Sequence, residues 1–508
     1  MDFLSTFQTT PATPLPPDRP PTVFMNGTFS SSNVSDTANT TETAALAIWH
    51  MLQGFLGTFP QFNPPQNSSV GVNLFAESYG GRYGPVFAET WKQQNAKRRN
   101  GTRYNTSLEI NLSSLGIMNG CVDDLIQGPS YSSMLVNNSY GLQLASSVQV
   151  AYNNATFFQA GGCQDLIYTC RNLTADLDPT NTGGVDEVNS ACARATGVCN
   201  DQLLSLYSDL DRSPYDIAHK QPDAFPSSYY IEYLNTRAVQ DALGAVVNYT
   251  DTSWNVYSAF ASTGDWERES MVPKLADLLT SGVRVGLVYG DRDYICNWMG
   301  GEAVSMALAS AAGGSYAANF PAAGYAPIIV NDSYIGGVVR QYANLSFSRI
   351  YQAGHFVPAY QPETAFQVFA RIILGNSVST GESVNLTSYN TTGPANATSS
   401  LSLPSSPSPT CFVRALNDSC PPDSISSILK NQGVIINGVW YAASSDWPGM
   451  TSTTSTSTAT SSTSATATLT GLFTATATPS NGASKAEPRV ASPFLLGLVA
   501  GILGVTIV

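Results

Sequence analysis

Alternating apolar and polar positions predict several strands that are followed by helices. Val70, Val72 and Leu74 alternate with other residues, as in a half-buried strand. Apolar runs over 283–289 and 347–351 predict two further strands. A helix is predicted from Pro362, because proline favours the first helical position and Gly375 follows the last apolar turn. We expect these elements to form an open α/β sheet.

Composition divides the chain into segments. Residues 26–375 alternate apolar runs with Gly, Asn and Pro breaks, as a folded domain does. A linker rich in Ser, Thr, Asn and Pro is predicted over 376–410, followed by a small segment over 411–450 in which Cys411 and Cys420 form a bridge. The stretch 451–480 is almost purely Thr, Ser and Ala, and is typical of an O-glycosylated stalk.

Both ends of the chain are unusual for a secreted protein. Residues 1–25 open with MDFLSTFQTTPATPLPPDRPP, which is acidic and interrupted by prolines, so no signal peptide is expected there. Over 481–508, small residues from Asn481 precede a polar spacer and a final apolar run, the layout of a GPI-attachment signal. The alternative, a transmembrane helix, needs a run of about 20 apolar residues. We therefore expect a GPI anchor attached at Asn481.

Charge and sugar acceptors indicate the compartment. The 508 residues carry a net charge of -13, with a sequence pI near 4.6. This argues against a nucleic-acid partner, since no basic stripe is present to contact phosphates. Asn-x-Ser/Thr sequons are scattered from Asn26 to Asn417, as in a glycosylated extracellular protein. The closely spaced cysteines in 163–199 are then expected to be disulfides.

Ser78 is the candidate nucleophile. The stretch 76–81, AESYGG, follows the first predicted strand, and a helix is expected to begin near Val86. Small residues around a serine at a strand-to-helix turn are typical of a nucleophile elbow, where bulky neighbours would clash and the hydroxyl is exposed above the sheet. The pattern alone is weak, because most such serines are ordinary turn residues. It needs a base and an orienting carboxylate.

Asp293 is the candidate for the orienting carboxylate. It lies in GDRDYICNW, 290–298, directly after the strand predicted over 283–289. The carboxyl end of a parallel strand lies on the same sheet edge as the elbow. The alternative is a solvated Asx-turn, which aspartates after glycine often form.

His355 is the candidate base. Of the three histidines, His50 lies in an amphipathic helix pattern and His219 in a polar, solvent-facing loop. His355 follows the strand predicted over 347–351, within AGHFVP, and precedes the helix that begins at Pro362. The order Ser, Asp, His is that of the α/β-hydrolase arrangement. The long interval between Ser78 and Asp293 leaves room for a cap over the site, at about 121–250.

Three blocks of this sequence resemble the serine carboxypeptidase family of the carboxypeptidase Y type. They are ESYGG at 77–81, GDRDYICNW at 290–298 and AGHFVP at 353–358. The stalk and anchor signal resemble the layout of fungal carboxypeptidase S1 homologues. The resemblance implies an α/β-hydrolase fold, with Ser78 as nucleophile, Asp293 as orienting carboxylate and His355 as base.

The resemblance also implies further roles. The backbone N–H of Tyr79 would form one arm of the oxyanion hole, and Glu77, as a protonated donor, would help to bind the terminal carboxylate of the substrate. Such a neutral glutamic acid favours activity at acidic pH. Nested disulfides would pair Cys163 with Cys199 and Cys170 with Cys192. Cys296 matches a free thiol near the catalytic site.

Two features depart from the family pattern. Ala76 replaces the glycine that is usual two residues before the nucleophile, a change the elbow should tolerate. The family also has early strands and a Trp-Leu-Asn-Gly-Gly-Pro-Gly-like block upstream of the position of Asn26, and no such block occurs here. Because that block supplies the second oxyanion donor, we expect a severely weakened enzyme and an open sheet edge. We hypothesise an incomplete or misassembled gene product, which sequencing the transcript upstream of Met1 would test.

The expected function is hydrolysis of the C-terminal peptide bond of peptides and proteins through an acyl-enzyme at acidic pH. Neither a cofactor nor a metal is expected, since no HExxH or similar cluster occurs. The membrane is expected to be contacted only through the GPI anchor, at the cell surface or wall. One alternative is a surface glycoprotein that has lost catalysis, and another is an acyltransferase that uses the same triad.

Overall fold

The computed structural model describes the folded parts of the chain in several stretches. Of the predicted segments, the N-terminus 1–25, the stalk 451–480 and the anchor signal 481–508 lie outside the described residues. None of the helices in the described stretches is both long enough and apolar enough to cross a membrane. The described residues are 38–59, 71–101, 107–202, 207, 212–220, 223, 225–226, 229–245, 248–397, 401, 411–413, 416, 420–436 and 438–446.

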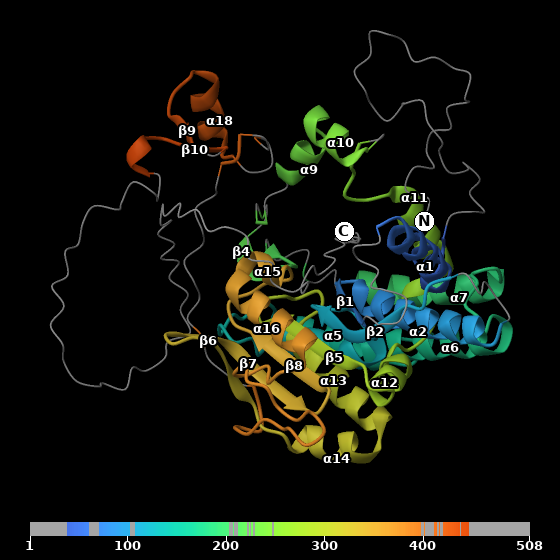
Figure 1. Ribbon diagram of the computed structural model, residues 1–508. Coiled ribbons are helices and arrows are strands. Elements are labelled where there is room, and N and C mark those ends of the chain that lie inside the picture. The colour runs from blue at the N-terminus through green and yellow to red at the C-terminus, as the bar shows by residue number, and fades with distance from the viewer. Residues whose placement is uncertain are drawn as a thin grey trace, which may run out of the picture.

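A mixed six-stranded sheet lies at the centre of the fold (Figure 1). Its strand order is β1-β2-β5-β8-β7-β6, with the first four strands parallel and the last two antiparallel. The strands are β1 (Gly71–Glu77), β2 (Asn111–Met118), β5 (Arg284–Gly290), β6 (Ala326–Asn331), β7 (Tyr334–Tyr342) and β8 (Leu345–Ile350). The carboxyl ends of the four parallel strands therefore meet at one edge of the sheet, where open α/β folds place their sites.

Helices cover both faces of this sheet and fill the long interval between β2 and β5. They are α1 (Thr41–Thr58), α2 (Gly80–Arg99), α3 (Asp124–Gln127), α4 (Pro129–Val136), α5 (Ser147–Phe158), α6 (Cys163–Leu177), α7 (Asp186–Gly197), α9 (Tyr229–Leu234), α10 (Arg237–Leu243), α11 (Trp254–Thr263), α12 (Val272–Thr280), α13 (Trp298–Ala312), α14 (Gly314–Ala322), α15 (Val357–Tyr360), α16 (Pro362–Leu374) and α18 (Pro422–Leu429). The helix predicted from Pro362 is α16, and Gly375 ends it in the left-handed conformation.

Successive residues of β5 pack against helices on opposite faces of the sheet, so both faces of this strand are buried. Val285 and Leu287 are buried in the larger core, on the side of α12 and α13. Gly286 and Val288 point the other way, toward α16, and a Cβ atom at Gly286 would lie 2.4 Å from Ile372. Each fully buried valine or leucine contributes about 1.5–3 kcal/mol. Because both faces are apolar, the strand reads as a continuous hydrophobic run.

β1, the strand that leads to Ser78, forms one end of the sheet. In the described part of the chain it pairs only with β2. Residues 72–77 are half-buried, whereas every residue of β8 is buried.

The predicted cap, about 121–250, contains α3 to α10 and a hairpin of β3 (Arg212–Ser213) and β4 (Asp216–Lys220). Two disulfides hold α6 to α7 and to the turn that follows α7, Cys163–Cys199 and Cys170–Cys192. They are the nested pairs that the family resemblance implies. Both bridges are buried, so they fasten a polar helical region from within.

The first part of the predicted linker is not a linker in the structure. The segment 376–397 packs against the antiparallel strands, where the Thr391 N–H donates to the Gln341 carbonyl at 2.9 Å and the Tyr325 N–H to the Pro394 carbonyl at 2.8 Å. Buried Arg349 donates to the carbonyl of Ala397. These polar contacts need backbone partners rather than apolar side chains, so hydrophobic patterning did not reveal them.

The small segment predicted over 411–450 has structure of its own. Cys411 and Cys420 are bridged, as expected. Apolar residues of this segment form an antiparallel hairpin of β9 (Val434–Ile436) and β10 (Val439–Tyr441), preceded by α18.

Candidate active site

Ser78 occupies a strained turn between β1 and α2. Its φ is +60°, a left-handed conformation that is uncommon for a residue with a side chain. Its N–H donates to the Met118 carbonyl at 3.1 Å, which holds the turn against β2. The neighbours must be small, since a Cβ atom at Gly80 would lie 2.6 Å from that of Ala76. The structure thus builds a nucleophile elbow that accommodates Ala76.

The helix after the elbow begins earlier than the sequence analysis predicted. α2 begins at Gly80, not near Val86, and carries Pro85 within its first turns. Because proline has no N–H, the i to i−4 hydrogen bond that residue 85 would donate to the Gly81 carbonyl is absent from this part of α2. A Cβ atom at Gly81 would lie 2.7 Å from the Cys121 carbonyl oxygen, so the double glycine lets the helix begin directly at the turn.

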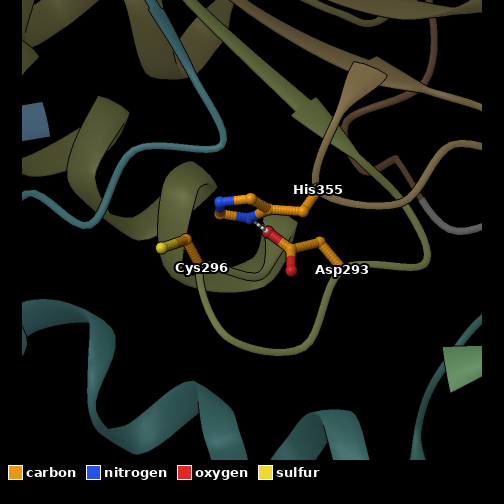
Figure 2. Close-up of side chains that lie close together, drawn as sticks. All are labelled: Asp293, Cys296 and His355. Carbon is orange, nitrogen blue, oxygen red and sulfur yellow. Dashed lines mark hydrogen bonds and ion pairs between the residues drawn. The ribbon is translucent and has the colours of Figure 1, made fainter. Parts of the chain in front are cut away.

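Asp293 and His355 lie together beyond the ends of β5 and β8. Figure 2 shows the imidazole of His355 facing the carboxylate of Asp293. The His355 Nδ1 lies 2.8 Å from the Asp293 Oδ2, and both side chains are buried. This contact fixes the Nδ1–H tautomer and leaves Nε2 available as a proton acceptor. Ser78 follows β1 at the same edge of the sheet.

The surroundings of His355 favour its protonated form. Burial lowers the pKa of His355, but the negative charge of Asp293 and the hydrogen bond to it outweigh burial, and the charge of Glu77 adds to them. The net effect raises the pKa above its ordinary value. A base that gains a proton during a reaction is stabilised by this arrangement.

Glu77, next to Ser78, is held close to its neutral form. Burial raises its pKa to about 7, with His355 opposing the shift and Asp293 adding to it. Glu77, at the end of β1, thus interacts electrostatically with both the imidazole and the carboxylate. A carboxyl group that is neutral at acidic pH can donate a hydrogen bond.

Tyr79 caps the N-terminus of α2 and lies directly after Ser78. Its ring is buried, and its hydroxyl donates to Asp265, which also accepts from the Thr41 N–H at 2.8 Å. This anchor fixes the residue whose N–H is the predicted oxyanion donor. The positive end of the helix dipole lies at the same place.

Cys296 is not the free thiol that the resemblance implied. It forms a disulfide with Cys121, which joins the Asp293 loop to the loop after β2. Asp293, Cys296 and His355 gather closely, with one potential ligand atom of each within 4.8 Å of the others (Figure 2). The sulfur is bonded to Cys121 and Nδ1 to the carboxylate, so these groups are committed to the protein rather than to a metal.

The other histidines lie elsewhere. His50 lies in α1, which confirms the predicted helix, and its side chain is exposed. The prediction of a solvent-facing loop for His219 is wrong, because this residue lies in β4, is 7% exposed and contacts Asp223 at 3.0 Å and Asp216 at 3.4 Å. The two aspartates, at three positions before and four after, are the signal that could have indicated its burial.

Sequence reasoning missed two residues that contact the site. The carbonyl of Tyr215, in the cap hairpin, accepts the His355 N–H at 2.8 Å, and its ring centroid lies 5.1 Å from the imidazole. Asn119, at the end of β2, donates to Asp293 at 2.7 Å. Only Asn119 had a readable signal, since it follows a strand of the same sheet edge.

Residues 25–375 match the family model described as serine carboxypeptidase. The chain belongs to the serine carboxypeptidase family. Its similar relatives within this family include carboxypeptidase S1 homolog B of Arthroderma otae, 42% identical over 73% of this chain and 56% of the relative. Carboxypeptidase S1 homolog A of the same fungus is 38% identical over 85% of this chain and 66% of the relative. The chain thus spans 56–66% of the length of these two relatives.

A solved structure agrees with the fold of this serine carboxypeptidase family member. Kex1Δp, a prohormone-processing carboxypeptidase from Saccharomyces cerevisiae, matches with a TM-score of 0.50 and 20% identity. The match covers 68% of this chain and 69% of that one. The likeness concerns the fold, and together with the family it supports an α/β-hydrolase fold with helices on both faces of the central sheet.

Proposed function

We propose that this protein is a serine-type carboxypeptidase that hydrolyses the C-terminal peptide bond of peptides and proteins. The observation that carries the proposal is the buried contact of 2.8 Å between His355 Nδ1 and Asp293 Oδ2, at the same sheet edge as the strained Ser78. Family membership supports the same reaction.

In the proposed reaction, the Ser78 hydroxyl attacks the scissile carbonyl carbon while His355 Nε2 takes its proton. The C–N bond then breaks, and His355 returns the proton to the amine of the departing C-terminal residue. Water hydrolyses the resulting ester, again with His355 as base. Asp293 stabilises the imidazolium, and the Tyr79 N–H at the start of α2 stabilises the oxyanion.

Glu77 is the residue proposed to bind the C-terminal carboxylate of the substrate, and its protonation influences the pH range of the activity. A substrate with a free C-terminus presents a carboxylate, which an ionised neighbour would repel and a neutral carboxyl group can bind. Since the pKa of Glu77 is about 7, this group is neutral at acidic pH. We therefore place the tightest binding of the substrate carboxylate on the acidic side of pH ~7, with the lower pH limit of the activity set by protonation of His355.

The proposed setting is the cell surface or wall. Sequons across the chain and four disulfides fit an extracellular glycoprotein. The proposed GPI attachment at Asn481 lies outside the described residues. Release of the protein from cells by phosphatidylinositol-specific phospholipase C would test that anchor.

A pair of matched substrates tests the proposed reaction. A blocked dipeptide with a free C-terminus should lose its C-terminal residue at mildly acidic pH, whereas the same dipeptide as its C-terminal amide should react far more slowly. Ser78→Ala should lower kcat by about 10⁶-fold. Equal hydrolysis by Ser78→Ala would contradict the proposal. Ester formation with an added alcohol, in place of hydrolysis, would indicate acyl transfer.

A further inference from the structure

Asn119 lies at the end of β2, between the strands that lead to Ser78 and to Asp293. It is completely buried, and its φ of +40° is in the left-handed region. Its N–H donates to the Val288 carbonyl on β5 at 2.8 Å, and the preceding carbonyl, of Met118, accepts the Ser78 N–H. Two adjacent residues therefore connect the elbow to the strand that leads to Asp293.

The side-chain amide of Asn119 is matched at both ends. Its Nδ2 donates to Asp293 Oδ2 at 2.7 Å, and its Oδ1 accepts the Gly290 N–H at 3.0 Å. One neighbour is only an acceptor and the other only a donor, so the orientation of the amide is determined by its partners. A carboxylate would meet Asp293 with like charge, and an apolar side chain would leave both partners unsatisfied.

Asp293 depends on this amide for its orientation. Its Oδ2 accepts from Asn119 and from His355 Nδ1, whereas its buried Oδ1 has no hydrogen-bond partner among the side chains and backbone groups that the structure describes. Both fixed contacts thus converge on one oxygen. Without the amide, the imidazole alone would hold the carboxylate.

We propose that Asn119 is a positioning residue that aims the Asp293 carboxylate at His355. The proposal rests on the proposed function of the triad and adds a fourth residue to it. Asn119 acts through Asp293 and does not contact the reacting atoms.

Several ionisable groups face this pair and bear on its test. His355 lies on the other side of the carboxylate, and Glu77 at the end of β1 interacts electrostatically with both. Four tyrosines interact electrostatically with Asp293, namely Tyr131 on α4, Tyr207 in the cap, Tyr215 in the cap hairpin and Tyr289 on β5. Their pKa values are raised by burial, so they remain neutral in the acidic range.

Two substitutions change the side-chain amide of Asn119 without straining the backbone, because aspartate and glycine both accept a positive φ. In Asn119→Asp, a protonated carboxyl group can still donate to Asp293 and accept from Gly290. After it ionises, it repels Asp293. Asn119→Gly removes both hydrogen bonds at every pH.

Steady-state kinetics on the blocked dipeptide across acidic to neutral pH should show the difference. Asn119→Gly should lose about 10²-fold in kcat at every pH, as misplaced catalytic groups do, with KM unchanged. Asn119→Asp should approach wild-type kcat at the lowest pH and fall toward Asn119→Gly as pH rises. Melting temperatures of both variants serve as the measure of folding.

Two readouts keep this test separate from the proposed function. If the wild-type protein does not cleave peptides but its Ser78 reacts with a fluorophosphonate, the proposed function fails, and the labelling rates of the variants should follow the same pattern. Titration of His355 by NMR needs no activity, and with three histidines the signals are readily assigned. Its pKa should rise in Asn119→Asp as the second carboxylate ionises.

Three results would overturn the proposal. These are wild-type kcat in Asn119→Gly, a loss in Asn119→Asp that does not depend on pH, and an unchanged pKa of His355 in a folded Asn119→Asp protein.

Discussion

At the scale of single residues, the acidic groups and the base of the candidate site interact electrostatically with one another. Half-buried Glu77 and buried Asp293 and His355 lie at one edge of the sheet, where charges interact more strongly than in water. Asp293 and Glu77 stabilise the imidazolium, while burial keeps Glu77 near its neutral form. Ionisation of Glu77 therefore changes both the group proposed to bind the substrate carboxylate and the negative charge that acts on the base, His355.

Glu77→Gln tests the proposed role of the neutral carboxyl group. In the wild-type protein, KM for a blocked dipeptide should increase as pH rises through about 7, because ionised Glu77 repels the substrate carboxylate. The amide of the variant stays neutral, so its KM should lack that increase. Steady-state kinetics between acidic and mildly alkaline pH measure both curves.

The fall of kcat at low pH serves as the internal control for Glu77. It reflects protonation of His355 and should persist in Glu77→Gln. Identical pH dependence of KM in the two proteins would show that Glu77 is not the group that binds the carboxylate.

His219 should make stability depend on pH. Burial lowers its pKa, but the hydrogen bond to Asp223 and the charges of Asp216 and Asp223 outweigh burial, so the pKa is raised. The contribution of His219 is then full below its unfolded pKa of about 6.5 and is lost as pH rises through the folded pKa.

His219→Gln should therefore be less stable than the wild-type protein below pH ~6.5, and the difference should shrink at higher pH. Urea unfolding at several pH values measures it. His50→Gln is the matched control, since His50 is exposed. A difference that does not vary with pH would assign His219 a role in packing only.

At the scale of elements, two connections hold the catalytic loops. The cap hairpin contacts both, since Tyr215 accepts from His355 and the Ile217 N–H donates to the Arg292 carbonyl at 2.8 Å. The Cys121–Cys296 disulfide joins the loops after β2 and β5. The parallel strands determine which loops lie side by side. The hairpin contacts and the disulfide then fix the positions of these loops relative to one another.

Removal of the Cys121–Cys296 disulfide should destabilise the catalytic fold. Closing a long loop restricts the unfolded chain strongly, and loss of a native disulfide costs about 2–5 kcal/mol. Its cysteines are 175 residues apart, whereas Cys411 and Cys420 are 9 apart. Thermal unfolding of Cys121→Ala/Cys296→Ala should show a lower main transition.

The matched control is Cys411→Ala/Cys420→Ala, which should leave the main transition in place. The native protein should also resist thiol-modifying reagents, because the structure describes no free cysteine. Equal shifts in the two double variants, or rapid inactivation by a thiol reagent, would contradict this account.

At the scale of the whole molecule, the structure extends the catalytic unit beyond residue 375. A chain that ends after Leu401 should keep the main melting transition of the full chain, since the packed segment 376–397 is retained. A chain that ends after Gly375 should melt at lower temperature, because Arg349 and the strand β7 lose their backbone partners. Differential scanning calorimetry of the two truncations, with the full chain as reference, measures this. Similar melting of both would contradict it.

The sequence predicted local order better than contacts across the fold. β1, β5, β8 and α16 follow from apolar runs, a proline and a glycine, because these act within a few residues. The burial of His219, the Cys121–Cys296 bridge and the packing of 376–397 depend on partners far away in the chain. Hydrophobic patterning carries no information about such polar and covalent partners.

The candidate site shows the same division. Ser78, Asp293 and His355 could be proposed because each follows a readable strand, and parallel topology brings strand ends together. The roles of Asn119 and Tyr215 arise from a side-chain amide and a backbone carbonyl whose partners only the three-dimensional structure identifies.

The most direct measurement of the central claim is peptide mapping by mass spectrometry after reaction with a fluorophosphonate. Activation by His355 and Asp293 predicts a single phosphonylated residue, Ser78, and slow labelling in His355→Gln and Asp293→Asn. An unmodified Ser78, or undiminished labelling of Ser78 in both variants, would contradict the proposed triad.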